Sequence, residues 1–402
     1  MRTYTRRLII FLLTSFCVST IAAQNWYKGN LHTHSLWSDG DNFPEMIADW
    51  YKSNGYNFLV ITDHNRLQEG DNWRTVPGGF LTSEAFSKYK EKFGTQYVEV
   101  KNEGNDMMKV RLKTLAEYRP NYEEKGRFLL INGEEITSSY GGLPLHVNGI
   151  NTKEVIPRQY GNSLSDVLQH AVNTTLLQRK RTGQKMFPIL NHPNFWKTYT
   201  ASDIVKVQNV RFFEVQNGLL QTGSYGDHNH DSTEIMWDKV NLQLIKQGRP
   251  LLFGVGVDDS HNYHQFGPLY HNPGRAWVMV NAPTLEATDL IDAMEAGRYY
   301  ASTGIVLKDL TVTQKQISLK VESEVDVVYT IQFIGVRKGG EKATIIKQVT
   351  GTEASYTLNE QDLFVRAKII SSKFPKNPHK PGDYETAWTQ PVSPLAVPYN
   401  AP

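Results

Sequence analysis

Cysteine is almost absent from this chain, since Cys17 is the only one among 402 residues. It lies in an apolar segment near the N-terminus, and residues 14–16 in front of it do not form a lipoprotein processing site. If that segment is removed, the mature protein contains no thiol, which excludes disulfide bonds. An exported protein without disulfides has to be stabilised by its core, by bound metal ions or by both.

Long hydrophobic runs are missing as well. The apolar run near the N-terminus, residues 8–18, has eleven residues, fewer than the roughly 18 to 20 that a membrane-spanning helix needs. Three arginines precede this run and small residues ending at Ala23 follow it, which is the layout of a secretory signal peptide. We therefore expect residues 1–23 to be cleaved and the mature protein to be secreted or periplasmic; a membrane anchor is the alternative.

The chain also lacks an excess of either charge, with 43 Lys and Arg against 41 Asp and Glu. Loss of residues 1–23 removes three arginines, so the mature chain is nearly neutral. This balance gives no electrostatic reason to expect a nucleic-acid surface, and no polybasic stretch suggests contact with anionic lipid. We expect no nucleic-acid partner and no stable membrane anchor, and the oligomeric state is left open.

Residues 24–305 alternate helix-period and strand-like segments, a pattern typical of a parallel α/β architecture. Helices are expected at about residues 44–54, 164–172 and 234–247, each followed by an apolar strand. A charged insertion, residues 66–127, has helix-like stretches at 83–93 and 107–118. It is either a peripheral excursion or a substrate lid, and the lid is favoured because the insertion lies between two chemically distinctive motifs.

Residues 306–402 change to short alternating apolar runs separated by turn residues, which predicts a C-terminal antiparallel β-sandwich. The Pro- and Lys-rich stretch KFPKNPHKPGDYE is expected to be a long loop before a last strand. Such a sandwich either packs on its enzyme or binds carbohydrate, and packing is the favoured role.

What the chain does contain is histidine and carboxylate residues at the ends of apolar segments. Five motifs hold them: NLHTHSLWSDG, ITDHN, INGEEITSSYGGLPLHVNG, ILNHPN and GVGVDDSH. On an extended strand His32 and His34 project to the same side, whereas the neighbours Glu134 and Glu135 project to opposite sides. Nitrogen and carboxylate groups that converge from several strand ends are what a cluster of divalent metal ions requires.

The order of these motifs resembles the PHP (polymerase and histidinol phosphatase) family of metal-dependent phosphoesterases. The secretory signal and the stretch GRYYASTG are more similar to its CehA/McbA-type metallohydrolase branch. The resemblance covers residues 30–304, and it implies a distorted (β/α)7 barrel with two or three divalent metal ions.

Carried over residue by residue, the resemblance implies nine metal ligands. They form three sets, of which the first and third share Glu135: His32, His34, Glu135 and Asp259; Asp39, His64 and His261; and Glu135, His146 and His192. Position 39 is a histidine in some relatives. Zinc, manganese and iron are all compatible with mixed imidazole and carboxylate ligands, so the metal is left open.

The chemistry expected of such a cluster is hydrolysis. A water between two metal ions loses its proton near neutral pH, so it can attack a phosphorus or carbonyl centre. Arg275 or Arg66, each near a metal motif, could grip a phosphate, although either could equally be a structural residue. The leaving group could take its proton from Asp63 or from a bound water.

Three functions follow, in decreasing order of preference. The first is a secreted phosphoesterase that acts on small phosphate mono- or diesters. The second is a hydrolase of carbamates, amides or carboxylic esters, for which an apolar pocket is expected; Trp37, Phe195 and Trp196 lie beside metal motifs. The third is a non-catalytic carbohydrate- or surface-binding protein on the same scaffold.

Overall fold

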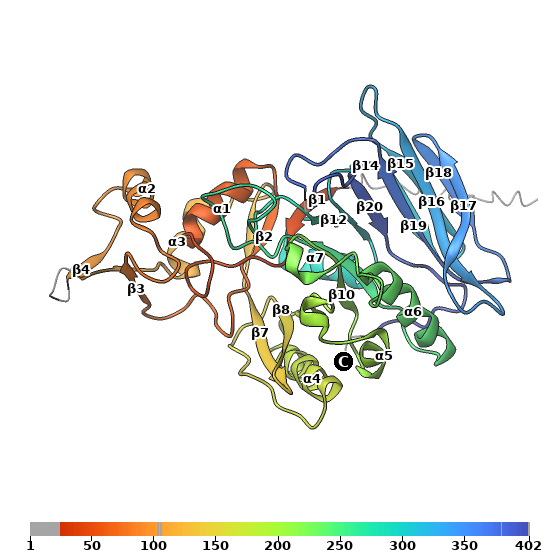
Figure 1. Ribbon diagram of the computed structural model, residues 1–402, viewed down its shortest axis with the longest axis horizontal. Coiled ribbons are helices and arrows are strands. Elements are labelled where there is room, and N and C mark those ends of the chain that lie inside the picture. The colour runs from red at the N-terminus through yellow and green to blue at the C-terminus, as the bar shows by residue number, and fades with distance from the viewer. Residues whose placement is uncertain (1–24, 103, 105–106, 379, 401–402) are drawn as a thin grey trace, which may run out of the picture.

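The computed structural model describes residues 25–102, 104, 107–378 and 380–400. Figure 1 shows the insertion, with α2, β3 and β4, at one end of the molecule and the strands β14–β19 at the other. The expected signal peptide lies outside the described residues. Among the helices described, none combines the length and apolar character needed to cross a membrane.

A nine-stranded sheet runs through the molecule in the order β17-β16-β19-β20-β13-β12-β1-β2-β6. Strands β1, β2 and β6 are parallel, whereas β12 pairs with β1 and β13 in antiparallel fashion. The bounds in this half are β1 Trp26–Asn30, β2 Phe58–Val60, β6 Leu129–Ile131, β12 Trp277–Asn281 and β13 Tyr299–Ser302.

A second sheet has the order β11-β10-β9-β8-β7. Its strands are β7 Gly133–Tyr140, β8 Leu143–Ile150, β9 Phe187–Leu190, β10 Phe212–Asn217 and β11 Phe253–Val257. Single bridges from Thr33 to Ser260 and from His64 to Glu135 link this sheet to the first one. The described strands do not form one closed sheet, so the expected α/β class is confirmed but the (β/α)7 barrel stays a prediction. The expected parallel sheet is in fact mixed.

Helices cover the outer faces of the two sheets. They are α1 Pro44–Ser53, α4 Leu164–Thr182, α5 Ala201–Lys206, α6 Thr233–Lys246 and α7 Ala287–Glu295. The Ser163 side chain caps the start of α4, and Gly183 ends it in the left-handed conformation that glycine adopts without strain. The three helices expected from the sequence between residues 24 and 305 are therefore confirmed.

The insertion has its own small core, and part of it differs from the prediction. Helix α2 spans Ser83–Phe93 as expected, but the expected helix at 107–118 is wrong in its first half. Strand β5, Met108–Arg111, pairs with β3, Trp73–Val76, and with β4, Val100–Asn102. Helix α3, Leu115–Tyr122, begins only after Thr114, whose side chain forms a capping box with Glu117.

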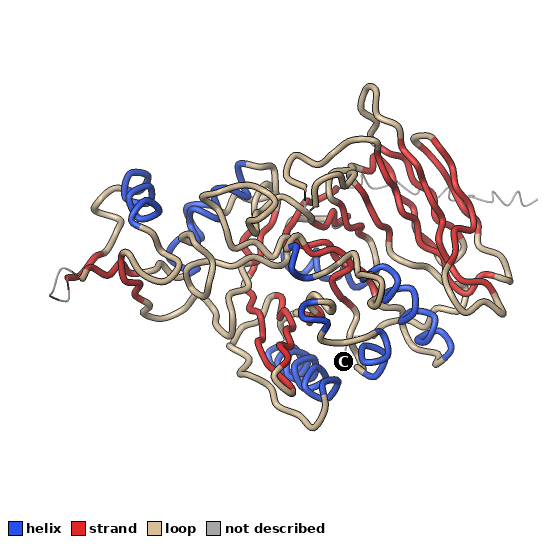
Figure 2. The backbone as a smooth tube through the Cα atoms, in the orientation of Figure 1, coloured by secondary structure: helices blue, strands red, loops and turns tan. Residues whose placement is uncertain are grey.

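After α7 the described chain contains only strands and connecting segments (Figure 2). These strands are β14 Leu307–Thr313, β15 Gln316–Val321, β16 Tyr329–Arg337, β17 Thr344–Thr350, β18 Glu353–Thr357, β19 Asp362–Ser371 and β20 Thr386–Thr389. Strands β14, β15 and β18 form a separate antiparallel sheet, and the other four belong to the nine-stranded sheet. The expected strands are thus present.

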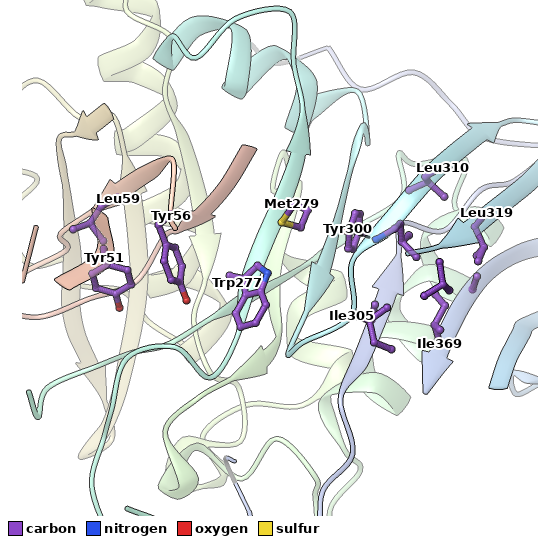
Figure 3. Packing of buried hydrophobic residues seen from close by; sticks show 14 of the residues in the cluster. Tyr51, Tyr56, Leu59, Trp277, Met279, Tyr300, Ile305, Leu310, Leu319 and Ile369 are labelled. Carbon is purple, nitrogen blue, oxygen red and sulfur yellow. Dashed lines mark hydrogen bonds between the residues drawn. The ribbon is translucent and has the colours of Figure 1, made fainter. Parts of the chain in front are cut away.

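One hydrophobic cluster joins both C-terminal sheets to the rest of the chain (Figure 3). It contains Leu319 of β15 and Ile369 of β19, and it extends through Tyr300 to Trp277 of β12. Strand β20 pairs with β13, so hydrogen bonding continues across residue 305. The domain boundary expected there, and a self-contained sandwich beyond it, stay predictions.

A buried carboxyl group lies where α1 meets the insertion. Glu45 is fully buried and accepts hydrogen bonds from Tyr89 Oη at 2.6 Å and from Tyr97 Oη at 3.2 Å. Burial raises the pKa of Glu45 to about 7, although both tyrosines act to lower it. Between about pH 4.5 and pH 7 the folded protein therefore holds a proton that the unfolded chain has already released.

Glu45→Gln tests this prediction. Because the folded pKa exceeds the unfolded value near 4.5, Glu45 costs stability as pH rises through this window, by up to about 3 kcal/mol above pH 7. The free energy of unfolding of Glu45→Gln should therefore exceed the wild-type value increasingly from pH 5 to pH 8. Denaturant unfolding at both pH values measures it, and a difference that does not change with pH would contradict the assignment.

Candidate metal centre

The nine residues expected as metal ligands converge on one site. His32 and His34 follow β1, His64 follows β2, His192 follows β9, and Asp259 and His261 follow β11. Glu135 and His146 lie inside the hairpin of β7 and β8, and Asp39 lies in the loop between β1 and α1. Four groups of these side chains each place one donor atom per residue within 4.8 Å of the others.

The central donors surround two buried carboxylates. His32 Nε2 lies 3.3 Å from both Glu135 Oε1 and Asp259 Oδ1. His34 Nε2 lies 3.4 Å from Glu135 Oε2 and 3.3 Å from Asp259 Oδ1. A tetrahedral site with bonds of about 2.1 Å has ligand atoms about 3.4 Å apart. These four separations match those of ligands around one ion, and they exceed the length of strong charge-assisted hydrogen bonds.

A second group forms around Asp39. Its Oδ1 lies 3.4 Å from His34 Nδ1, and its Oδ2 lies 3.5 Å from both His64 Nε2 and His261 Nε2. Asp39 is one-third exposed, so this group is the one closest to solvent. The donor set again fits a divalent cation.

On the other side, Glu135 Oε1 lies 2.9 Å from His146 Nδ1 and 3.2 Å from His192 Nε2. The grouping agrees in part with the sets that the family resemblance implies, since Asp39, His64 and His261 fall together, and it differs at two histidines. His192 groups with His32 and Asp259, and His64 groups with Glu135 and His146. Glu135 is thus shared between groups, as a bridging carboxylate would be.

The electrostatics of the site keep its carboxylates charged. Burial acts to raise the pKa of Glu135 and Asp259, but the surrounding histidines hold both well below the usual range. Burial likewise opposes protonation of His64, yet Glu135 and Asp39 raise its pKa to about 11. Without a metal ion, protonated imidazole supplies the positive charge that the buried carboxylates need.

Backbone bonds hold the two principal loops together. The Asp259 N–H donates to His32 O at 3.0 Å, and the His34 N–H donates to Ser260 O at 2.9 Å. Asp259 has φ = 51°, in the left-handed region that aspartate adopts only at a cost. A residue held in this region by its surroundings is typical of a functional site.

The two adjacent glutamates have different environments. Glu135 faces the histidines, whereas Glu134 lies on the other side of β7 and accepts a hydrogen bond from Ile156 N at 2.8 Å. Burial raises the pKa of Glu134 to about 8, so its carboxyl group is mostly neutral at pH 7. The alternation of a β-strand therefore separates them as expected.

Several supporting residues were missed at the sequence level. Glu214, in the buried strand β10, accepts from His32 Nδ1 at 2.6 Å and from the His192 N–H at 2.8 Å. Asn217 Nδ2 donates to Asp259 Oδ2 at 3.0 Å, and Asn191 Nδ2 donates to Glu135 Oε1 at 2.7 Å. A glutamate within the apolar run FFEV was the available signal for Glu214, because an unpaired buried charge is very costly.

Asp63, expected as a possible proton donor, has an organising position. It is completely buried, and its carboxylate accepts from Ser35 N, Ser35 Oγ, Ser38 Oγ and Gln68 Nε2 at 2.7 to 2.9 Å. It does not line the cavity beside the histidines. Its contacts fix the loop that carries His34 and Asp39.

The two candidate phosphate-binding arginines also lie away from the donors. The Arg275 guanidinium is buried and donates to the carbonyls of Gly218 and Gly267, each at 2.9 Å. Arg66 is exposed, and neither arginine lines the cavity. Their expected role in gripping phosphate is not supported by this placement.

The cavity in front of the donors, the metal cavity, has a volume of about 380 Å³. Phe80 from the insertion, Phe195 and Leu219 form its apolar part, and Gln221 and Asn262 add neutral polar groups. No lysine or arginine lines it among the described residues. Trp37 instead packs in the core of the insertion, and Trp196 is two-thirds exposed.

No protein-family model matches this chain, and no curated protein matches it. Among solved structures, it is similar to a two-domain protein of Bacteroides vulgatus ATCC 8482 that contains a predicted PHP-like metal-dependent phosphoesterase. The identity is 14%, the TM-score is 0.42, and the alignment covers 95% of this chain and 98% of that one.

Two further structures align over less of this chain. An amidohydrolase from Chromobacterium violaceum, with bound sulfate and no metal, is 13% identical with a TM-score of 0.27, covering 59% of this chain and 88% of that one. A proposed metal-dependent phosphoesterase from Bifidobacterium adolescentis ATCC 15703 is 11% identical with a TM-score of 0.27, covering 61% and 87%.

Glu214→Gln tests the support of the candidate centre. Loss of the carboxylate that orients His32 should weaken metal binding about 10- to 100-fold. Competition with a chromogenic chelator measures the affinity. Glu134→Gln is the matched control, since Glu134 is equally buried, faces away from the site and should leave affinity unchanged. Equal effects of both substitutions would contradict an orienting role for Glu214.

Proposed function

We propose that this protein is a metal-dependent hydrolase whose nine converging residues hold two or three divalent ions, of zinc, manganese or iron. The observation that carries the proposal is the spacing of the central donors. Imidazole nitrogens lie 3.3 to 3.4 Å from the oxygens of two buried carboxylates, which is the edge length of a coordination tetrahedron.

The residues divide the work of such a site. Glu135, Asp259 and the histidines would hold the ions, and Glu135 would be shared between them because it belongs to two of the donor groups. Glu214 and Asn217 orient His32 and Asp259. When bound, the ions supply an activated water nucleophile and neutralise the negative charge that develops in the transition state. Phe80, Phe195 and Leu219 exclude water from one side of the cavity.

Phosphoester hydrolysis is the leading reaction, and diesters fit better than monoesters. A monoester carries a second negative charge, and the lining of the metal cavity adds no lysine or arginine to the positive charge that the ions would bring. A diester has one negative charge and a second organic group, for which the apolar side of the cavity provides a surface. We therefore place small phosphodiesters ahead of phosphomonoesters as substrates.

Hydrolysis of carbamates, amides or carboxylic esters is the second candidate. The observation that favours it is an aromatic side chain beside the metal donors. The ring centroid of Phe195 lies 5.1 Å from that of His192. This second function is the one that a member of the secreted CehA/McbA-like branch would have. It also implies a periplasmic or extracellular location after removal of residues 1–23.

Metal removal and ligand substitution test the hydrolase. Chelation should abolish hydrolysis and readdition of Zn²⁺, Mn²⁺ or Fe²⁺ should restore it; elemental analysis should find two or three ions per chain.

His192→Ala and Asp259→Ala should each lose more than about a hundredfold in kcat/KM. His230→Ala, at a solvent-facing histidine paired with Asp227, is the control and should retain activity. Unchanged hydrolysis by His192→Ala would remove the metal mechanism.

Phe195→Ala distinguishes substrates by their apolar group. With an aryl ester, loss of the ring should raise KM by roughly 10-fold or more, whereas a methyl ester of the same acid should be little affected. A panel of phosphate monoesters, phosphate diesters, carboxylic esters and carbamates, each as an aryl and a methyl compound, measures this. Turnover of carbamates without turnover of any phosphate ester would overturn the leading reaction.

A further inference from the structure

A second hollow lies away from the metal centre, between α6 and the C-terminal strands, and is called here the aromatic cleft. Its volume is about 400 Å³, within the range of small-molecule sites. Tyr225, Tyr384 and Trp388 line it together with Glu234, Lys368 and Asp383. None of these six residues takes part in the metal centre.

One aromatic ring of the cleft is buried and two are partly exposed. Trp388 of β20 is 4% exposed, whereas Tyr225 and Tyr384 are 45% and 47% exposed. Tyr384 stacks on Phe374, with ring centroids 4.9 Å apart and an interplanar angle of 15°, so this contact supports one face of its ring. Exposed aromatic side chains held in place around a hollow offer flat surfaces to a ligand at little entropic cost.

The charged groups of the cleft balance in number, and Lys368 and Glu234 form a direct ion pair. Lys368 Nζ donates to Glu234 Oε1 at 2.5 Å, and Tyr225 Oη donates to Asp383 Oδ2 at 2.5 Å. The lining contains two acidic and two basic side chains, the fourth being Arg275. The buried Arg275 Nε–H has no acceptor among the described residues, which leaves a donor to be satisfied. An uncharged ligand rich in hydroxyl groups suits this lining better than an ion.

We propose that the aromatic cleft binds a neutral carbohydrate. A sugar ring has an apolar face of C–H groups, which stacks on the negative face of an aromatic ring, and an edge of hydroxyls, which pairs with carboxylate, amide and amino groups. Tyr225, Tyr384 and Trp388 supply the faces, and Asp383, Glu234 and Lys368 supply the polar partners. Gln216, Ser232 and Thr303 add further neutral groups to the wall.

The cleft is connected to the metal cavity through one loop, residues 218–232. Leu219 and Gln221 of this loop line the metal cavity, and Ser224 and Tyr225 line the aromatic cleft. A bound sugar would therefore contact the segment that also borders the hydrolytic site. Sugar binding in the cleft requires no metal ion. A failure of the proposed hydrolysis would therefore not contradict it.

Binding to the full mature protein tests the proposal. The probes are neutral trisaccharides of glucose, galactose, mannose, xylose or N-acetylglucosamine, measured by saturation-transfer NMR and calorimetry. At least one should bind, and Tyr384→Ala and Tyr225→Ala should each weaken it by about tenfold or more. Tyr160→Ala, at an exposed tyrosine outside the cleft, and Asp259→Asn, at the metal centre, should both leave it unchanged.

Three results would overturn the assignment. They are no binding of any trisaccharide at about 10 mM, binding that survives both cleft substitutions, and tighter binding of a sulfated than of a neutral trisaccharide. Circular dichroism and hydrolysis of a small ester by Tyr384→Ala would show that the variant is folded, so that lost binding reports on the cleft.

Discussion

The architecture of this protein depends on one buried carboxylate. Glu135 is almost fully buried and lies within 3.4 Å of nitrogen atoms from His32, His34, His64, His146 and His192. A buried anion has to be compensated by protons or by metal ions, and its partners come from three separate segments and from β8 beside it. The two sheets meet where this requirement is satisfied, through the bridge between His64 and Glu135.

Hydrogen bonds from other parts of the fold fix the loops that carry the metal-donor residues. Asp63 fixes the loop after β1 through four hydrogen bonds. Asp258, next to Asp259, accepts from the backbone N–H groups of Gly274, Arg275 and Ala276 and from Tyr51 Oη. Asp63 and Asp258, although they belong to metal motifs, thus act as structural hydrogen-bond acceptors. The next residue in sequence after each of them, His64 and Asp259, faces the metal cavity. This division explains how loops of irregular conformation keep a precise geometry.

Sequence patterns predicted which residues meet but not everything that surrounds them. The nine donors were implied by the family resemblance in motif order, and they do converge. Strand alternation predicted that only one of Glu134 and Glu135 would enter the site, and the motif spacing of the resemblance favoured Glu135. The direction in which Arg275 points was not predictable, since its partners are carbonyls that carry no sequence signal. The strand at Met108–Arg111 was mistaken for helix because its pairing partners, β3 and β4, are formed by the insertion itself. The contact of Glu214 with His32 was not predicted, because Glu214 belongs to none of the five metal motifs.

The pairing of β20 with β13 has a consequence for how the polypeptide can be divided. Tyr300, Ala301 and Ser302 each face a partner residue of β20, and β13 is only two strands from β1, which leads into His32. A fragment that stops near residue 305 would carry β13 as a bare, apolar sheet edge. Such an edge recruits strands from other copies, so the shortened polypeptide is expected to self-associate rather than behave as a smaller enzyme.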